Sequence, residues 1–206
     1  MRGRNLNPER LPAQLGPMNA ETQALVDELI ASEGSISHLY LDTRGLVTVG
    51  VGECLETPSE AQGLAFVRRG DGAKASRDEI STEWHTVRAC APGQVAKAYR
   101  NSTELELPAI EIERILLVRV AEFEGGLRRQ FKDYDELPAL VRMALVDMAF
   151  NLGLTGLAKK FPKFSAAIAR GDFMTAAAES KRKGVAGRRN AKVRRWLKFA
   201  GSMSGD

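Results

Sequence analysis

Three residues near the start of the chain, Glu33, Asp42 and Thr48, bring two carboxyl groups and a hydroxyl group within 16 residues. Cleavage of a glycosidic bond needs one carboxylic acid to protonate the leaving oxygen, and a second group to stabilise or attack the sugar cation. In that chemistry Glu33 is the acid, Asp42 is the ionised carboxylate, and Thr48 holds a water molecule. A helix that ends in Glu-Gly and a turn of the form Asp-x-x-Gly are also common structural features. These residues alone leave both interpretations open.

Glu33 stands at the end of a segment with helical spacing. Asn19 is a favourable N-cap residue, apolar residues recur from position 24 to position 30, and Gly34 is suited to end the helix. Glu33 follows Ile30 by three residues and shares the face of the apolar stripe. We therefore expect its carboxyl group to face the protein interior, where desolvation disfavours the charged form and the acid keeps its proton.

The next segment, residues 39–52, predicts a β-hairpin. Asp42 and Gly45 occupy the first and last positions of a type I turn. Alternation after the turn places Thr48 and Gly50 on the polar face of the strand, with Thr48 two strand steps from solvent. Glycine at positions 50 and 52 weakens a strand unless backbone or ligand must come close there.

Beyond the hairpin, apolar residues recur at helical spacing, weakly up to residue 107 and strongly after it. A long stripe predicts one helix over residues 108–124, ended by Gly125-Gly126. Residues 140–152 are apolar nearly all round, which is typical of a buried central helix. Shorter helices are expected at residues 80–87, 95–99, 164–168, 173–178 and 191–197.

The order and spacing of the first residues resemble the signature of the phage-type lysozymes, glycoside hydrolase family 24. That signature reads Glu-Gly, Tyr-x-Asp, a turn glycine and Thr-x-Gly-x-Gly. The chain matches it without a gap at Glu33-Gly34, Tyr40-x-Asp42, Gly45 and Thr48-x-Gly50-x-Gly52. The resemblance implies that Glu33 is the general acid, Asp42 the second carboxylate and Thr48 the water-positioning hydroxyl. It also assigns Tyr40 and Gly50 to substrate binding.

Two later segments resemble the same family. Residues 142–153 are similar to the central helix of its C-terminal lobe, and Asn151 falls where relatives carry an amide that faces the cleft. This implies that Asn151 binds substrate. The sequence Gly184-Val185-x-x-Arg188-Arg189-x-Ala191 is similar to a Gly-Leu-x-x-Arg-Arg stretch near the end of many endolysins.

Two departures from the family pattern affect the expected cleft. Glu53 stands where the family usually has a histidine, so the pairing made by that histidine is lost or replaced. The stretch between the hairpin and the long helix is also much longer than usual. It predicts an insertion around residues 57–107 that reshapes the rim of the cleft.

The resemblance implies an α+β, two-lobed lysozyme-like fold with the cleft between the lobes. The predicted parts are an extended arm (1–18), a lysozyme-like domain (19–201) made of an N-terminal lobe (19–107), a connecting helix (108–124) and a helical C-terminal lobe (125–201), and a tail (202–206).

The composition is that of an ordinary globular protein, with 44% hydrophobic and 27% charged residues. No apolar run reaches the roughly 20 residues that span a bilayer, and the proline-broken start is not a signal peptide. We therefore expect synthesis in the cytoplasm and action on the bacterial cell wall after release or delivery.

Cys54 and Cys90 match no metal spacing and are expected to be free thiols. His38, at a variable position of the motif, is expected at the surface.

The net charge of +4 is unevenly distributed, because residues 181–198 contain nine Lys or Arg residues and no acidic residue. Such a stripe is typical of nucleic-acid binding, of attachment to an anionic cell envelope, or of a solvated face. The family resemblance favours the envelope, and no nucleic acid is expected. Since Arg188 and Arg189 lie in the matched segment, we expect Lys181, Arg182 and Lys183 to form the exposed part.

The implied function is hydrolysis of the β-1,4 bond between N-acetylmuramic acid and N-acetylglucosamine in bacterial peptidoglycan, by a monomer without metal or cofactor. Two settings fit: a phage endolysin, and the payload of an antibacterial toxin, which would have an immunity protein as partner. One alternative is a lytic transglycosylase that uses Glu33 alone; another is a non-catalytic relative that binds wall or nucleic acid. The presence of both Asp42 and Thr48 favours the hydrolase.

Overall fold

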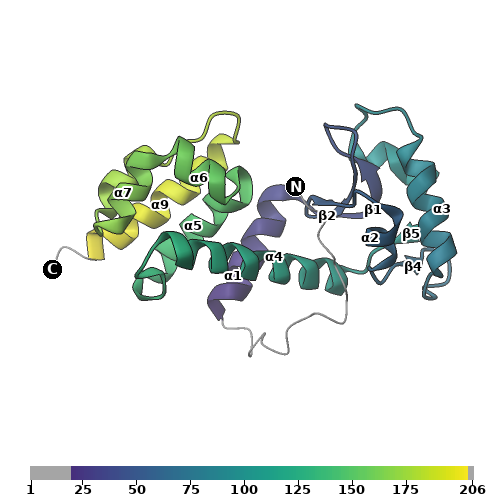
Figure 1. Cartoon of the computed structure of the whole chain (residues 1–206), viewed down its shortest axis with the longest axis horizontal. Helices are drawn as coiled ribbons and strands as arrows, with labels where there is room; N and C mark the ends of the chain where they lie inside the picture. Colours follow the sequence, from purple (N-terminus) through teal and green to yellow (C-terminus); the bar gives the residue numbers. More distant parts are fainter. Residues whose placement is uncertain (1–19, 204–206) are drawn as a thin grey trace. The chain divides into compact units, whose positions relative to one another are not determined.

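The computed structural model describes residues 20–203 and has an α+β fold (Figure 1). The chain divides into two compact units, Met1–Val118 (the first unit) and Arg119–Asp206 (the second unit). The predicted arm, 1–18, and positions 204–206 of the predicted tail lie outside the described residues. Residues 202 and 203 are not a tail, because they belong to the last helix.

The first unit begins with helix α1 (Ala20–Glu33), followed by strands β1 (Ile36–Leu41), β2 (Val47–Gly50) and β3 (Glu53–Cys54). The strands form an antiparallel sheet in the order β1-β2-β3, so the predicted hairpin is confirmed. Tyr40 pairs with Thr48 and Leu41 with Val47. The apolar stripe of α1 is buried at Leu25, Val26 and Leu29.

The region between the hairpin and the long helix has structure of its own and packs on the hairpin. Its elements are α2 (Pro58–Gln62), β4 (Val67–Arg68), α3 (Arg77–Arg88), the 3-10 helix η2 (Ala96–Ser102) and β5 (Leu105–Glu106). Strand β1 contacts η2, α3 and β5. The start of α2 is set by a capping box between Thr57 and Glu60, and that of α3 by one between Ser76 and Glu79.

This packing decides the roles of two aromatic side chains. Trp84 is buried, and its Nε1 donates a hydrogen bond of 3.0 Å to the Leu55 carbonyl oxygen. His38 was expected at the surface, and that expectation is wrong. The residue is 4% exposed, and its Nε2 donates to the Ala96 carbonyl oxygen at 2.9 Å. The cause is that η2, which comes from the long insertion, covers β1.

Helix α4 (Ala109–Gln130) begins where the sequence predicts but does not end at Gly125-Gly126. It runs through both glycines, and the boundary between the two units falls within it, after Val118. Gly126 serves close packing here, because a Cβ atom at this position would collide with the side chain of Leu154. The two glycines therefore do not stop the helix, although they lower its intrinsic stability.

The rest of the second unit is helical, as predicted. Its elements are η3 (Tyr134–Glu136), α5 (Ala139–Leu152), α6 (Leu154–Lys160), α7 (Pro162–Ala169), α8 (Phe173–Glu179) and α9 (Gly187–Met203). Helix α5 is the buried central helix, since its side chains from Met143 to Ala149 are all buried. Among residues 20–203, no single helix is long and apolar enough to cross a membrane, and only α5 and α6 together, bent by 99°, have that length and composition.

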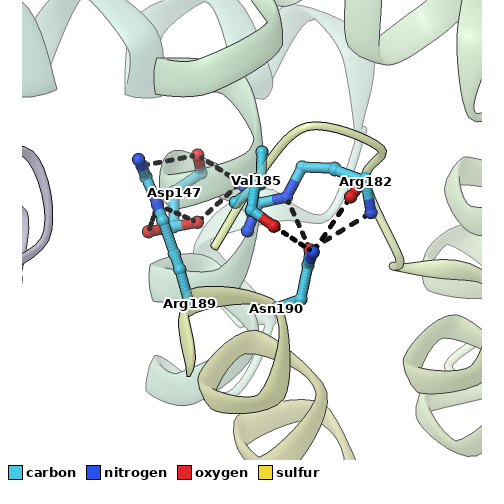
Figure 2. A network of polar contacts seen from close by, with 5 residues as sticks. All are labelled: Asp147, Arg182, Val185, Arg189 and Asn190. Carbon is cyan, nitrogen blue, oxygen red and sulfur yellow. Dashed lines mark hydrogen bonds and ion pairs between the residues drawn. The ribbon is translucent and has the colours of Figure 1, made fainter. Parts of the chain in front are cut away.

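One charged residue, Asp147, is buried in the middle of α5 (Figure 2). Its carboxylate accepts from Arg182 Nη1 at 2.8 Å and from Arg189 Nε at 2.9 Å. The expectation that Arg182 belongs to the exposed part of the basic stripe is therefore wrong, because the residue is only 2% exposed. Arg189 is structural in the same way. At both positions, the free-energy cost of burying a guanidinium group is offset by its ion pair with the buried carboxylate.

Candidate active site

The hairpin turn places Asp42 by local hydrogen bonds. The Gly45 N–H donates to the Asp42 carbonyl oxygen, the Asp42 N–H donates to the Leu46 carbonyl oxygen, and Gly45 has a φ of +74°. This is a type I turn followed by a residue in the left-handed region, a common hairpin connection in which glycine is favoured. Asp42 and Gly45 are thus required by the turn, whatever else they do.

The Asp42 side chain also holds the turn. Its Oδ1 accepts from the backbone N–H groups of Arg44 and Leu46, at 2.8 and 2.9 Å, and its Oδ2 accepts from Arg44 Nε at 3.2 Å. Burial pushes the pKa of Asp42 upward, but these donors and the nearby Arg44 charge outweigh it and hold the pKa below its ordinary value. The carboxylate is therefore ionised at neutral pH, as the sequence predicts.

Thr48 lies next to this turn in β2. Its Oγ1 donates to the Leu46 carbonyl oxygen at 3.0 Å, so a single backbone residue, Leu46, is hydrogen-bonded to both Asp42 and Thr48. Thr48 is 2% exposed, and every residue of β2 is buried. The predicted polar face of the hairpin is therefore wrong, because Thr48 and Gly50, which lie on it, are both buried. A Cβ atom at Gly50 would lie 3.4 Å from Ile112 Cγ2 of helix α4.

Tyr40 connects the hairpin electrostatically with the end of α1. It pairs with Thr48 across the two strands, so their side chains share one face of the sheet. The pKa of Tyr40 is raised, first by burial and then by the negative charges of Asp42 and Glu33. The tyrosine hydroxyl therefore lies in the field of both carboxylates. Tyr40, Asp42 and Thr48 thus lie together at the hairpin, and the charge of Glu33 reaches Tyr40 from the end of α1.

Glu33 is the last residue of α1, and Gly34 follows it with a φ of +77°. The side chain is exposed, so the expectation of a carboxyl group facing the interior is wrong. Position 33 does follow Leu29 by one helical turn and lies on its side of the helix. The helix ends there, however, and the apolar residues that bury Leu29 do not extend to the final residue.

One departure from the family pattern, Glu53, lies in the sheet of this unit. Glu53 is buried in β3 and pairs with Val49 of β2, so the position taken by a histidine in the family holds a buried carboxyl residue. Cys54 pairs with Thr48 in the same sheet, and both Cys54 and Cys90 are free thiols. Asn151 lies elsewhere, in the last turn of α5 in the second unit, where it is exposed.

Arg44 is the residue of this neighbourhood that the sequence reasoning missed. Its backbone N–H and its guanidinium both donate to the Asp42 carboxylate, while most of its side chain is exposed. The available signal was its position two residues after an aspartate that opens a turn, where the backbone N–H commonly donates to the aspartate side chain.

The chemistry available here is that of two carboxyl groups in different surroundings, a tyrosine and a hydroxyl. In residues 20–203, no group of three or more His, Cys, Asp or Glu side chains is arranged to hold a metal ion.

In comparison with known proteins, the sequence matches no family model and no curated protein.

Proposed function

We propose that this protein is a muramidase that hydrolyses the β-1,4 bond between N-acetylmuramic acid and N-acetylglucosamine in bacterial peptidoglycan. The observation that carries the proposal is the hairpin turn, where Leu46 is hydrogen-bonded to both Asp42 and Thr48. The field of Asp42 and Glu33 on Tyr40 adds the end of α1 to the same neighbourhood. The residue types and their spacing also resemble the motif of the phage-type lysozymes.

Each residue of the motif has a role in the proposed mechanism. Glu33, exposed at the helix end, is accessible to a substrate and donates the proton to the leaving oxygen. Asp42 stays ionised and stabilises the sugar cation that develops as the bond breaks. Thr48 already donates its proton to Leu46, so its hydroxyl oxygen is left as an acceptor that orients an ordered water. The family resemblance assigns Tyr40 and Gly50 of the first unit, and separately Asn151 of the second unit, to substrate binding.

The nature of the products tests this proposal. Incubation of purified peptidoglycan with the protein should lower the turbidity, and mass spectrometry should find fragments that end in a reducing N-acetylmuramic acid. A lytic transglycosylase, acting with Glu33 alone, would instead leave 1,6-anhydro ends. Anhydro products, or intact peptidoglycan after prolonged incubation, would contradict the proposed hydrolysis.

We propose a phage endolysin or a delivered antibacterial toxin, the latter with an immunity protein, as the setting of this activity.

Substitution of Asp42 by asparagine should lower the rate of wall cleavage by roughly 10²-fold, because it removes the negative charge opposite the developing cation. The amide oxygen still accepts from the N–H groups of Arg44 and Leu46, so the hairpin is kept. The measurement is the initial rate of turbidity loss, together with the circular dichroism spectrum.

The matched control is Arg44→Gln, which removes the guanidinium that contacts Asp42 but keeps the carboxylate. This variant should clear peptidoglycan at a rate within a few-fold of the wild type. A folded Asp42→Asn variant with wild-type activity would exclude Asp42 from the chemistry and leave the single-glutamate alternative.

A further inference from the structure

The loop between α8 and α9 is held in one conformation by side-chain hydrogen bonds. Asn190 Nδ2 donates to the carbonyl oxygens of Arg182 and Val185, at 2.9 and 3.2 Å, and its Oδ1 accepts from the Arg182 N–H at 3.1 Å. Arg182 is tied in turn to the buried carboxylate of Asp147 (Figure 2). The loop is therefore anchored at both of its ends to helices of the second unit.

This anchored loop and α9 enclose a pocket with a volume of about 800 Å³, which lies within the second unit. Its size is within the range of roughly 300–1,000 Å³ that is usual for ligand sites. Lys181 and Lys183 line it from the loop, and Arg194, Arg195 and Lys198 line it from one face of α9. All five side chains are exposed, and no acidic residue among positions 20–203 lines the pocket. We refer to it as the basic pocket.

Six cations line the basic pocket, and the structure of residues 20–203 gives five of them, all except Arg182, no ion-pair partner. The buried Arg182 and Arg189, by contrast, both bind Asp147. Arg194 and Lys198 are four residues apart in one helix, where like charges destabilise it by about 0.2–0.5 kcal/mol. A polyanion in the pocket would remove this repulsion.

We propose that the basic pocket binds a phosphodiester-linked polymer attached to the cell wall. Guanidinium groups bind phosphate oxygens in pairs, and ammonium groups bind them as point charges, so this set of side chains suits successive phosphates. No aromatic residue lines the pocket to stack a base, which disfavours single-stranded nucleic acid. The choice of a wall polymer rests on the proposed function, and the site itself rests on the pocket.

The test is isothermal titration calorimetry, which measures the affinity of the full chain for a soluble polyol phosphate polymer at low salt. The variant Arg194→Gln/Arg195→Gln/Lys198→Gln should bind it roughly 10- to 100-fold more weakly, since each cation near an anionic surface contributes about a fivefold factor. The matched control is Lys159→Gln/Lys160→Gln/Lys163→Gln, which removes three exposed charges elsewhere in the same unit and should lower the affinity less than about threefold. A second variant, Lys181→Gln/Lys183→Gln, tests the opposite wall and should also weaken binding.

Three results would overturn the proposal: equal losses in the pocket and control variants, no binding of the polymer by the wild type, or tighter binding of single-stranded DNA of equal charge. Turnover of a short soluble muropeptide, measured in parallel, should be the same in the wild type and the pocket variant. Polymer binding without turnover would contradict the proposed function and leave the basic pocket standing. Turnover without polymer binding would support the proposed function and contradict the proposed role of the basic pocket.

Discussion

Substitution of Glu33 by glutamine is expected to abolish wall cleavage and to leave the fold intact. The amide has the shape of the carboxyl group but cannot protonate the leaving oxygen, and general acid catalysis contributes about 10²- to 10⁴-fold to the rate. Because Glu33 is exposed at the end of α1 and glutamine keeps the length of its side chain, the substitution should not disturb the packing of the helix. The rate of turbidity loss on peptidoglycan and the thermal unfolding midpoint are the two measurements.

The control is Asp27→Asn, which makes the same change of charge and group at an exposed position of the same helix. It should clear peptidoglycan at the wild-type rate. If both variants lost activity to the same extent, the effect would come from the charge of α1 rather than from proton donation. A Glu33→Gln variant that is folded and fully active would remove the general acid from the proposed mechanism.

The largest expected change in stability follows replacement of Asp147 by alanine. It leaves two buried guanidinium groups, those of Arg182 and Arg189, without the carboxylate that they share. Removal of one partner from a buried ion pair costs about 3–5 kcal/mol. The free energy of unfolding, measured in urea, should fall by this amount in the transition of the second unit. The chain has two units, so their transitions are separated by following Trp84 and Trp196, one in each unit.

A double-mutant cycle establishes whether the loss comes from the ion pairs. Arg189→Met in the Asp147→Ala background should cost much less than the same substitution in the wild type, because the buried charge no longer has its partner. Asp135→Asn provides the exposed comparison, since it breaks a surface ion pair with Arg128 and should hardly change the unfolding free energy. Additive effects of the two buried substitutions would contradict the coupling.

The features that depend on short-range chemistry could be predicted from the order of the residues alone. The hairpin follows from Asp42 and Gly45, which provide the turn with a carboxylate acceptor and a left-handed residue. The helices of the second unit follow from apolar spacing, and the burial of α5 follows from its apolar residues on every side. The roles of Glu33, Asp42 and Thr48 come from the motif and remain a prediction.

The depth at which each residue is buried depends on long-range packing and could not be predicted from local sequence. Helical spacing gives the face on which Glu33 lies but not where the surrounding core ends, so its exposure could not be read from the sequence. His38 is buried where η2, from a distant part of the chain, covers β1, and Gly50 of β2 lies against Ile112 of α4. Thr48 is buried in the same strand as Gly50. Position 126, within helix α4, is a glycine because the Leu154 side chain of another helix occupies the space that a Cβ atom there would need.

The buried ion pairs show the same limit most clearly. Arg182 and Arg189 look like their exposed neighbours in the basic stripe, and the carboxylate that they meet is 35 and 42 residues away in the chain. The residues within one or two helical turns of an arginine do not show whether its side chain is buried in an ion pair or exposed to solvent. The desolvation of a guanidinium is offset only where the fold brings a carboxylate to it, and this depends on how α5 and α9 pack.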